Sequence, residues 1–524
     1  MPKRTHIVPK TINLTLSPKQ AATTEGWLSI VVRTLGIRRE QVALARVIKR
    51  SVDARHRTPQ VLLTVEVFVD GEQMPPEIDF DYPNVNGQTP VVIVGGGPAG
   101  LFAALRLIEL GLKPILLERG KEVAERRRDI AQIHRGVGVD GESNYAFGEG
   151  GAGTFSDGKL FTRSKKRGDY NRALQTLVFH GASPEILYEA HPHIGTDCLP
   201  KIIERVRQTI LSAGGEIHFG AKVTDIEIRN NRAVGVWVGD NLVEGAAIVL
   251  ATGHSADDIY EMLHAKGVLL EAKPWAMGVR VEHPQSLIDR IQYHSDDMRE
   301  WLPAASYTLT AQVGGRGVYS FCMCPGGVIV PAMTDYRECV VNGMSASARS
   351  SRWANAGIVT EVRPEDFPHL HEEWGVLAGL KYRQQLERHA AEIVGGGGTA
   401  PAQRLGDFVA GRISIDLPRT SYLPKAVVKR GEEWLPQFMA DSLRGGFRQW
   451  GARMNGFVTN QAQIIGLESR TSTPVRIPRD KESLMHPVVV GLYPTGEGAG
   501  YAGGIISAAL DGTRVAEMIA ETVK

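Results

Sequence analysis

Cysteine is scarce in this chain of 524 residues, which has only four, at positions 198, 322, 324 and 339. Thiols so few and so scattered exclude a disulfide framework of the kind that holds small secreted domains together. Cys322 and Cys324 form the one close pair, and a zinc site there would need two further ligands that no adjacent Cys/His pair offers. The sequence therefore predicts neither a disulfide scaffold nor a metal site.

A charge excess and a long apolar run are also missing. The net charge of +2 gives no reason to expect nucleic acid or an anionic membrane as partner. The longest apolar run, Val91 to Leu105, is too short to span a bilayer and contains four glycines and a proline. The basic N-terminus is not followed by the apolar segment of an export signal. We expect a soluble, cytoplasmic protein whose oligomeric state the sequence leaves open.

Changes of hydrophobic periodicity divide the chain into three units. The first, residues 1–85, has predicted strands over 7–16, 42–52 and 61–69 and a helix over 26–35, a β-α-β-β order. A connector rich in proline and acidic residues, 74–83, follows it. The second unit is a discontinuous nucleotide-binding domain, predicted over 90–165, 205–265 and 485–524. The third is a substrate or cap domain over 166–204 and 266–484.

A phosphate-binding loop opens the second unit. The β-branched run Val91 to Val94 is typical of a strand buried on both faces, and it leads into Gly95-Gly96-Gly97-Pro98-Ala99-Gly100. In this G-x-G-x-x-G, Gly95 allows a tight turn, Gly97 lets a pyrophosphate approach the backbone, and Gly100 allows close packing of helix on strand. The following helix, predicted to end at Leu110, points free N–H groups at the phosphates.

An acidic residue stands at the distance that this motif requires. Glu118 ends the second predicted strand, where a carboxylate accepts hydrogen bonds from the ribose hydroxyls of a dinucleotide. The other glycine run, Gly395 to Gly398, follows a helix and is predicted to be a loop. The chain therefore has one dinucleotide fold, and a nicotinamide cofactor has no such fold of its own.

A second glycine motif favours FAD as the dinucleotide. The segment Leu492 to Gly504, followed by a predicted helix over 505–522, resembles the C-terminal flavin motif of glutathione-reductase-like flavoproteins. Its paired glycines let the backbone approach a flat ring, and the helix directs its positive end at the flavin edge that becomes anionic on reduction. Ala251-Thr252-Gly253 resembles the strand end beside the adenine half, and the strand near Val223 resembles the segment that meets the adenine.

Further segments extend the resemblance over nearly the whole chain. They are 50–55, 143–160, 191–193, 322–327 and 470–476. Together the chain resembles the bacterial FAD-dependent, or NAD(FAD)-utilising, dehydrogenase family within the glutathione-reductase-like superfamily. The resemblance implies an α/β fold, α+β overall, in which a Rossmann-like FAD-binding domain carries an inserted substrate domain and a small N-terminal α/β domain.

The cofactor is predicted to be noncovalent FAD, because no residue stands in a covalent-attachment motif. The glycine-rich segment 148–158 offers main-chain N–H groups to it. The residues predicted to contact it are Gly95, Gly97, Pro98, Ala99, Gly100, Glu118, Arg119, Gly151, Ala152, Thr154, Ser156, Val223, Ala251, Thr252, Gly253, Gly496, Glu497, Gly503, Gly504 and Ile505.

The reaction class follows from which motifs are absent. No cysteine lies between Gly100 and Asp197, where the flavin-dependent disulfide reductases carry their pair. We predict a dehydrogenase or reductase that moves a hydride to or from flavin N5 on a small organic substrate, with NAD(P)H as a transient reductant. The alternatives are a single-component flavin monooxygenase and a flavin-binding regulatory or assembly protein.

The catalytic residues are the least determined part of the prediction. Cys322 and Cys324 are candidates for a role at the flavin, since alternate strand positions share a face, and core packing is the alternative. His254, His191 and His193 are possible proton donors or structural histidines. Three arginines, Arg470, Arg476 and Arg479, either bind an anionic substrate or the FAD phosphates, or pair with carboxylates.

Overall fold

The computed structural model describes residues 10–70, 72, 76–162, 168–295 and 297–523. Residues 7–9 of the first predicted strand and residues 74 and 75 of the predicted connector lie outside this part of the chain, as does the predicted domain border at 165. In the described residues no helix is both long enough and apolar enough to cross a membrane.

The nucleotide-binding unit is built on a five-stranded parallel sheet. Its strands are β4 (Pro90–Val94), β5 (Lys113–Leu117), β6 (Glu216–His218), β10 (Ile248–Leu250) and β22 (Leu492–Pro494). They lie side by side in the order β6-β5-β4-β10-β22. This is the strand order of a Rossmann-like sheet. Successive strands are added on one side of β4 as far as β6, and the chain then crosses to the other side of β4 to add β10 and β22.

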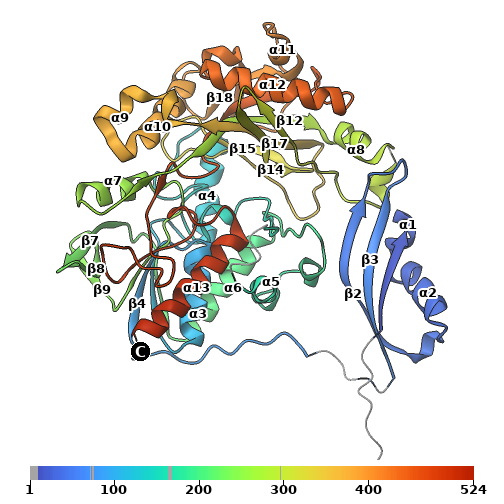
Figure 1. Cartoon of the computed structure of the whole chain (residues 1–524), viewed down its shortest axis with the longest axis horizontal. Helices are drawn as coiled ribbons and strands as arrows, with labels where there is room; N and C mark the ends of the chain where they lie inside the picture. The colour runs from blue at the N-terminus through green and yellow to red at the C-terminus, as the bar shows by residue number, and fades with distance from the viewer. Residues whose placement is uncertain (1–9, 71, 73–75, 163–167, 296, 524) are drawn as a thin grey trace, which may run out of the picture.

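Alternate residues of β4 show why its sequence is apolar throughout. Val91 and Ile93 pack with helices α3 (Pro98–Glu109), α6 (Leu199–Ser212) and α13 (Ile505–Val523) on one face of the sheet (Figure 1). Val92 and Val94 pack on the other face against α7 (Asp257–Ala265) and a three-stranded antiparallel sheet. Its strands are β7 (Val223–Arg229), β8 (Arg232–Val238) and β9 (Asn241–Glu244).

The C-terminal helix α13 packs against α3. The two approach so closely at Gly512 that an added Cβ would lie 2.0 Å from the carbonyl oxygen of Ala99. Helix α6 belongs to the same layer, so the domain border predicted between 204 and 205 falls inside a helix. Helices α4 (Val123–His134) and α5 (Tyr170–Phe179) complete this part of the fold.

The cap is a seven-stranded mixed sheet above the nucleotide-binding unit (Figure 1). Its strands, in spatial order, are β13 (Thr310–Val313), β14 (Arg316–Cys324), β17 (Trp353–Val362), β12 (Trp275–Pro284), β20 (Gln463–Glu468), β18 (Thr399–Arg404) and β19 (Lys425–Val428). Two short pairs accompany it: β15 (Val328–Pro331) with β16 (Val341–Met344), and β11 (Glu271–Ala272) with β21 (Val475–Arg476).

Among the described residues, five helices accompany the cap sheet. They are α8 (Gln285–Tyr293), α9 (Pro368–Trp374), α10 (Ala378–Glu392), α11 (Leu405–Ala410) and α12 (Gln437–Arg453). Helix α9 packs on α10. Gly375 takes φ +49 between α9 and α10 and separates the two helices. The segment Pro325-Gly326-Gly327 separates β14 from β15. Gly395 to Gly398 form the predicted loop after α10, each with positive φ.

The N-terminal unit has the predicted β-α-β-β order over its described residues. It contains β1 (Lys10–Leu16), α1 (Pro18–Ala21), α2 (Thr24–Leu35), β2 (Val42–Asp53) and β3 (Gln60–Val69), with β3 central in the sheet. Strand β2 also bonds to a segment beyond α5: Arg50 N donates to Tyr188 O and Ala190 N donates to Arg50 O, both at 2.8 Å.

Candidate flavin site

A crevice opens where the strand order reverses, at the carboxyl ends of β4 and β10. The turn after β4 meets the strand end of β10 here, and Gly95 takes φ +106. A Cβ at Gly95 would lie 2.4 Å from the carbonyl oxygen of Ala251, so only glycine fits this crossing. In open α/β sheets this switch point is where nucleotides bind.

A cavity of about 320 Å³ extends from the crevice to the cap sheet. Of the residues predicted to contact the cofactor, seventeen line it: Gly95, Gly97, Pro98, Ala99, Glu118, Arg119, Gly151, Ala152, Ser156, Val223, Ala251, Thr252, Gly253, Glu497, Gly503, Gly504 and Ile505. Segments some 400 residues apart in sequence are therefore brought around one elongated hollow, as a dinucleotide requires.

Three of the predicted contacts do not line the cavity. Gly100 packs helix α3 on the strand turn, since a Cβ there would lie 2.0 Å from Gly95 O. Thr154 turns its hydroxyl inward and donates to Glu149 O at 2.9 Å. Gly496 donates its N–H to Asp511 at 2.8 Å and lies against Ala99. These three residues do not face the ligand space; they pack against or hydrogen-bond to the segments that form the cavity wall.

The cavity floor is open where a pyrophosphate would need room. Gly97 has φ −78 and ψ −176, which any residue can adopt, and a Cβ there would meet nothing nearer than Gly151 Cα at 3.9 Å. Gly503, before helix α13, also has free space around the position of a Cβ. Sterics within the protein therefore do not require glycine at either position, and the space that each leaves fits a ligand. The residues present fit FAD.

Glu118 has a second role that its motif does not reveal. Its carboxylate accepts from three main-chain amides, Gly96 N at 2.7 Å and Gly120 N and Gly148 N at 2.9 Å each. A carboxylate has about four acceptor positions. Glu118 thus joins three loops of the site and keeps capacity for a ribose hydroxyl.

Replacing Glu118 by glutamine is expected to weaken FAD binding roughly ten- to a hundredfold, because a charged acceptor contributes about 1.5–3 kcal/mol. Glutamine keeps one carbonyl oxygen for the loop amides, so the fold should survive. Glu142→Gln is the control, since Glu142 pairs with Arg119 and Lys222 but does not line the cavity. Fluorescence titration of the stripped proteins with FAD measures the change. Equal affinity of Glu118→Gln and wild type would contradict the assignment.

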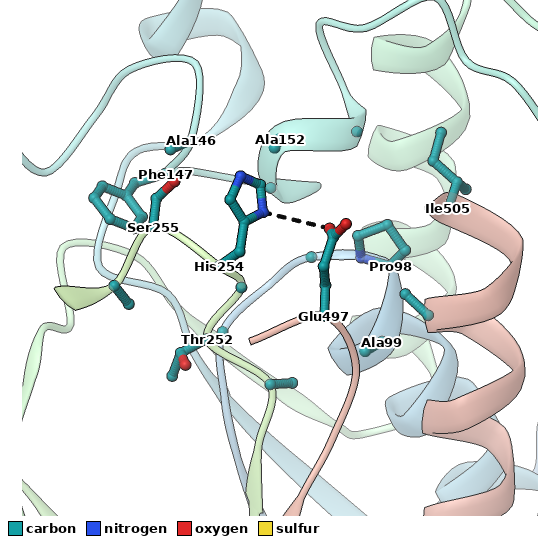
Figure 2. A pocket seen from close by; sticks show the side chains of 18 of the residues that line it. Pro98, Ala99, Ala146, Phe147, Ala152, Thr252, His254, Ser255, Glu497 and Ile505 are labelled. Carbon is teal, nitrogen blue, oxygen red and sulfur yellow. Dashed lines mark ion pairs between the residues drawn. The ribbon is translucent and has the colours of Figure 1, made fainter. Parts of the chain in front are cut away.

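The opposite end of the cavity lies between α13 and the cap. Figure 2 shows Pro98, Ala152 and Ile505 around the hollow and the side chain of His254 turned toward Glu497. His254 Nδ1 lies 3.4 Å from a carboxylate oxygen of Glu497. Of the three histidines proposed from sequence, His254 is the one that lines the cavity, whereas His193 bonds to Ser347 O at 3.0 Å.

The three candidate arginines have different positions. Arg470 lines the cavity, but its guanidinium is held by the buried carboxylates of Glu338 at 2.7 Å and Glu387 at 2.9 Å. Arg479 is bound by Asp511 at 2.5 Å and stacks on Tyr501, and Arg476 lies 3.7 Å from Glu271. All three therefore pair with carboxylates, and only Arg470 also reaches the cavity.

The two cysteines of β14 depart from the geometry expected of a regular strand. Cys322 has φ +44, and the pairing of β14 with β17 shifts register between Phe321 and Cys324. Cys322 lines the cavity while Cys324 is fully buried. The ammonium of Lys159 lies 3.9 Å from the Cys322 sulfur and 3.6 Å from the Cys324 sulfur.

Sequence reasoning did not single out several residues of this end. Lys159, Asp157, Phe161, Phe321, Asn342 and Thr471 line the cavity. Asp157 lies in the glycine-rich segment 148–158 and Lys159 directly follows it, but the spacing of the glycines does not mark either charge. Phe321 and Asn342 come from strands of the cap, where no local motif marks them, and Thr471 lies in the segment 470–476 without a role that its motif indicates.

Comparisons with known proteins agree with the site. Residues 88–137 match an FAD binding domain, residues 274–471 match the C-terminal domain of an FAD-dependent protein, and residues 8–68 match a domain of unknown function. A probable electron transfer flavoprotein-quinone oxidoreductase of Escherichia coli, YdiS, is 25% identical over 236 residues, 44% of this chain and 51% of that protein.

Solved structures and a full-length relative complete the comparison. CtdE in complex with FAD covers 83% of this chain and 89% of its own at 12% identity, with a TM-score of 0.34. A geranylgeranyl bacteriochlorophyll reductase-like protein of Thermoplasma acidophilum covers 83% and 78% at 14% identity and a TM-score of 0.35. A Clostridium beijerinckii protein described as uncharacterized is 40% identical over 511 residues, 94% of this chain and 95% of its own. The chain belongs to the family of FAD-dependent proteins that includes this Clostridium relative.

Proposed function

We propose that the protein is an FAD-dependent dehydrogenase or reductase that exchanges a hydride between a small organic substrate and bound FAD. The observation that carries this proposal is the continuous cavity from Glu118 at the end of β5 to Ile505 at the start of α13. When bound, FAD supplies the two-electron chemistry. The protein's own residues must hold the cofactor, admit a substrate and move a proton.

Cofactor binding is divided between the two ends of the cavity. Gly97 and the start of α3 offer room and N–H groups for the pyrophosphate, and Glu118 accepts from the ribose. The start of α13 brings the positive end of a 19-residue helix to the flavin end. That partial charge favours an electron-rich ligand there.

A second, smaller hollow supports an enzyme over a protein that holds FAD only structurally. It lies beside the first, with a volume of about 40 Å³, and the two share His254, Asn342 and Arg470 among their lining residues. The rest of its wall combines the apolar side chains of Val330, Val340 and Phe155 with the carboxylate of Glu468. Apolar walls with a few convergent polar groups are typical of small-molecule sites.

A proton donor or acceptor stands between the two hollows. His254 faces both, and Glu497 at 3.4 Å fixes the orientation of its ring. An imidazole held in this way can give or take the proton that accompanies hydride transfer. We assign it as the acid–base group of the proposed reaction.

Cofactor content and its reduction test the proposal together. Acid-precipitated protein should release one FAD per chain, identified by chromatography; FMN, NAD or no flavin would overturn the proposal. Anaerobic stopped-flow mixing with NADH or NADPH should reduce the flavin with saturation only at the high end of the common KM range of about 1 μM–1 mM. Saturation at low micromolar nicotinamide would reveal a second nucleotide site.

A further inference from the structure

A group of buried and half-buried charges surrounds the two thiols of β14. Lys159 binds Asp157 at 2.9 Å, and Arg349 binds the same carboxylate at 2.8 Å. From β12, Arg280 approaches the Cys324 sulfur at 3.9 Å and the Cys322 carbonyl at 3.2 Å. Its other nitrogens bind Glu468 of β20 at 2.8 and 3.2 Å. The thiols thus lie between the side chains of Lys159 and Arg280.

The cations of this group outnumber its carboxylates. In the described part of the chain, Lys159, Arg280 and Arg349 pair with two carboxylates, Asp157 and Glu468. His193 also faces Asp157, and burial lowers its pKa. Burial raises the pKa of Glu468 to about 7, against the attraction of Arg280, so below that pH the deficit of negative charge grows. Tyr307, the phenol nearest Cys324, does not supply an anion because burial raises its pKa. Buried charge needs a counter-charge, and among the described groups beside these cations the two thiols are the ones left that can become anions.

The two sulfurs share the Lys159 ammonium, and the Cys324 thiol donates to the Cys322 carbonyl at 3.3 Å. The neighbouring Cys324 side chain, together with Lys159 and Arg280, lowers the pKa of Cys322 to about 5 despite burial. The neighbouring Cys322, together with burial, raises the pKa of Cys324. Cys322 also sits at φ +44, a strained conformation that non-glycine residues rarely adopt. Cys322, which lines the cavity, is therefore the thiol of the two that ionises more readily.

We propose that Cys322 is a peroxide-reactive thiolate at the flavin end of the cavity and that Cys324 resolves its oxidised form into an intramolecular disulfide. Low pKa, access to a cavity and an adjacent second thiol are the properties that distinguish reactive cysteines from inert buried ones. The proposal rests on the proposed function for the source of oxidant, since a reduced flavin and dioxygen yield hydrogen peroxide in the same cavity.

The step balances with hydrogen peroxide as the oxidant. The Cys322 thiolate attacks one peroxide oxygen, the O–O bond breaks, and a sulfenic acid and hydroxide result. The Cys324 sulfur then attacks the Cys322 sulfur, and the S–S bond forms as the C–S–OH oxygen leaves with the Cys324 proton as water. Two electrons pass from the two sulfurs to the peroxide. Disulfide formation removes the negative charge of the Cys322 thiolate. Lys159 and Arg280 then remain beside the cavity without this counter-charge.

Trypsin places both cysteines in one peptide, residues 317–337, between Arg316 and Arg337. FAD-loaded protein treated with increasing hydrogen peroxide, alkylated and digested, should lose free thiol in this peptide and gain its internal disulfide. The exposed Cys198 of the same molecule is the internal reference. Near neutral pH we expect Cys322 to react roughly tenfold faster or more, since an ordinary thiol with a pKa of about 8.5 is mostly protonated there.

Three variants separate the roles. Cys324→Ser should stop at the sulfenic acid, which dimedone traps on Cys322, whereas Cys322→Ser should leave Cys324 reduced. Lys159→Met should slow the reaction near neutral pH, with the difference closing above the ordinary thiol pKa. Reaction of Cys198 as fast as Cys322, or a peptide that stays reduced, would overturn the proposal.

FAD content measured on the same samples keeps the two proposals apart. Protein that lacks FAD but forms the disulfide refutes the proposed function and leaves the thiol site standing. Protein that holds FAD while its Cys322 remains inert refutes the thiol site and leaves the proposed function standing. Iodoacetamide alkylation of the FAD-stripped protein gives the thiol reactivity without any contribution from the cofactor, and Cys322 should again react before Cys198.

Discussion

Replacing Gly97 by alanine is expected to reduce FAD affinity by at least about tenfold, equivalent to about 1.4 kcal/mol, while leaving the cofactor-free protein folded. The backbone at Gly97 has φ −78, so alanine adopts it without strain. The added Cβ has only Gly151 Cα near it, at 3.9 Å, and the cavity otherwise. The new methyl group would therefore occupy space that the pyrophosphate needs, and it would disturb little else.

Two further glycines sharpen this experiment. Gly138→Ala is the matched control, because Gly138 also has free space around its Cβ position but lies outside the cavity. Gly503→Ala tests the flavin end, where free space again adjoins the cavity. Both Gly97→Ala and Gly503→Ala should lose affinity in a fluorescence titration, with thermal unfolding of the stripped proteins close to wild type. A loss at Gly503 alone would mean that the ligand does not reach the phosphate loop.

The parts of the site that were predictable from sequence are those with a local cause. The strand, glycine turn and helix from Pro90 to Glu109 follow from a buried β-branched run, positive φ at Gly95 and close packing at Gly100. The same holds for the turn before α13. In both, the residues that create the geometry stand within about ten positions of each other, so that their spacing alone indicates the structure.

The parts that escaped prediction depend on contacts distant in the chain. Lys159 meets Cys322 across 163 residues, and Arg470 meets Glu338 across 132. No spacing rule relates such partners, because the cap sheet decides which strands become neighbours. Helix α12 was missed for a different reason: its Gly445-Gly446 pair, which packs against Val313 and Val318, resembles a turn when read without those partners.

Bulges limit strand reasoning in the same way. The alternation that placed Cys322 and Cys324 on one face assumes a regular strand, and the register shift in β14 breaks that assumption. Both sulfurs lie near Lys159, but the left-handed conformation of Cys322 brings them there and not the alternation of a regular strand. The shared-face geometry predicted for the two cysteines is therefore replaced by a bulge in which Lys159 lies 3.9 and 3.6 Å from the two sulfurs, and their role at the flavin stays a prediction.

The largest effect on stability is expected from Arg470→Met. The Arg470 side chain, only 5% exposed, donates to Glu387 at 3.1 and 2.9 Å and to Glu338 at 2.7 Å. Burial opposes ionisation of Glu387, yet Arg470 and Arg383 together lower its pKa. Removing one partner of a buried ion pair leaves an uncompensated charge and costs about 3–5 kcal/mol. Here one arginine serves two carboxylates, so a value at the upper end of this range is expected.

The pH dependence distinguishes this loss of charge from a loss of packing. In wild type the stabilisation from Glu387 is present above its unfolded pKa and fades as pH falls through the lowered folded value. In Arg470→Met both carboxylates shift to higher pKa, so the variant should lose stability as pH rises and approach wild type in acid. Urea unfolding of the FAD-stripped proteins at several pH values measures this without a contribution from cofactor binding. Arg337→Met, which removes an exposed arginine from Asp335, should change little at any pH. A deficit in Arg470→Met that stayed constant across pH would mean that the arginine acts by filling space, with Glu338 and Glu387 already neutral.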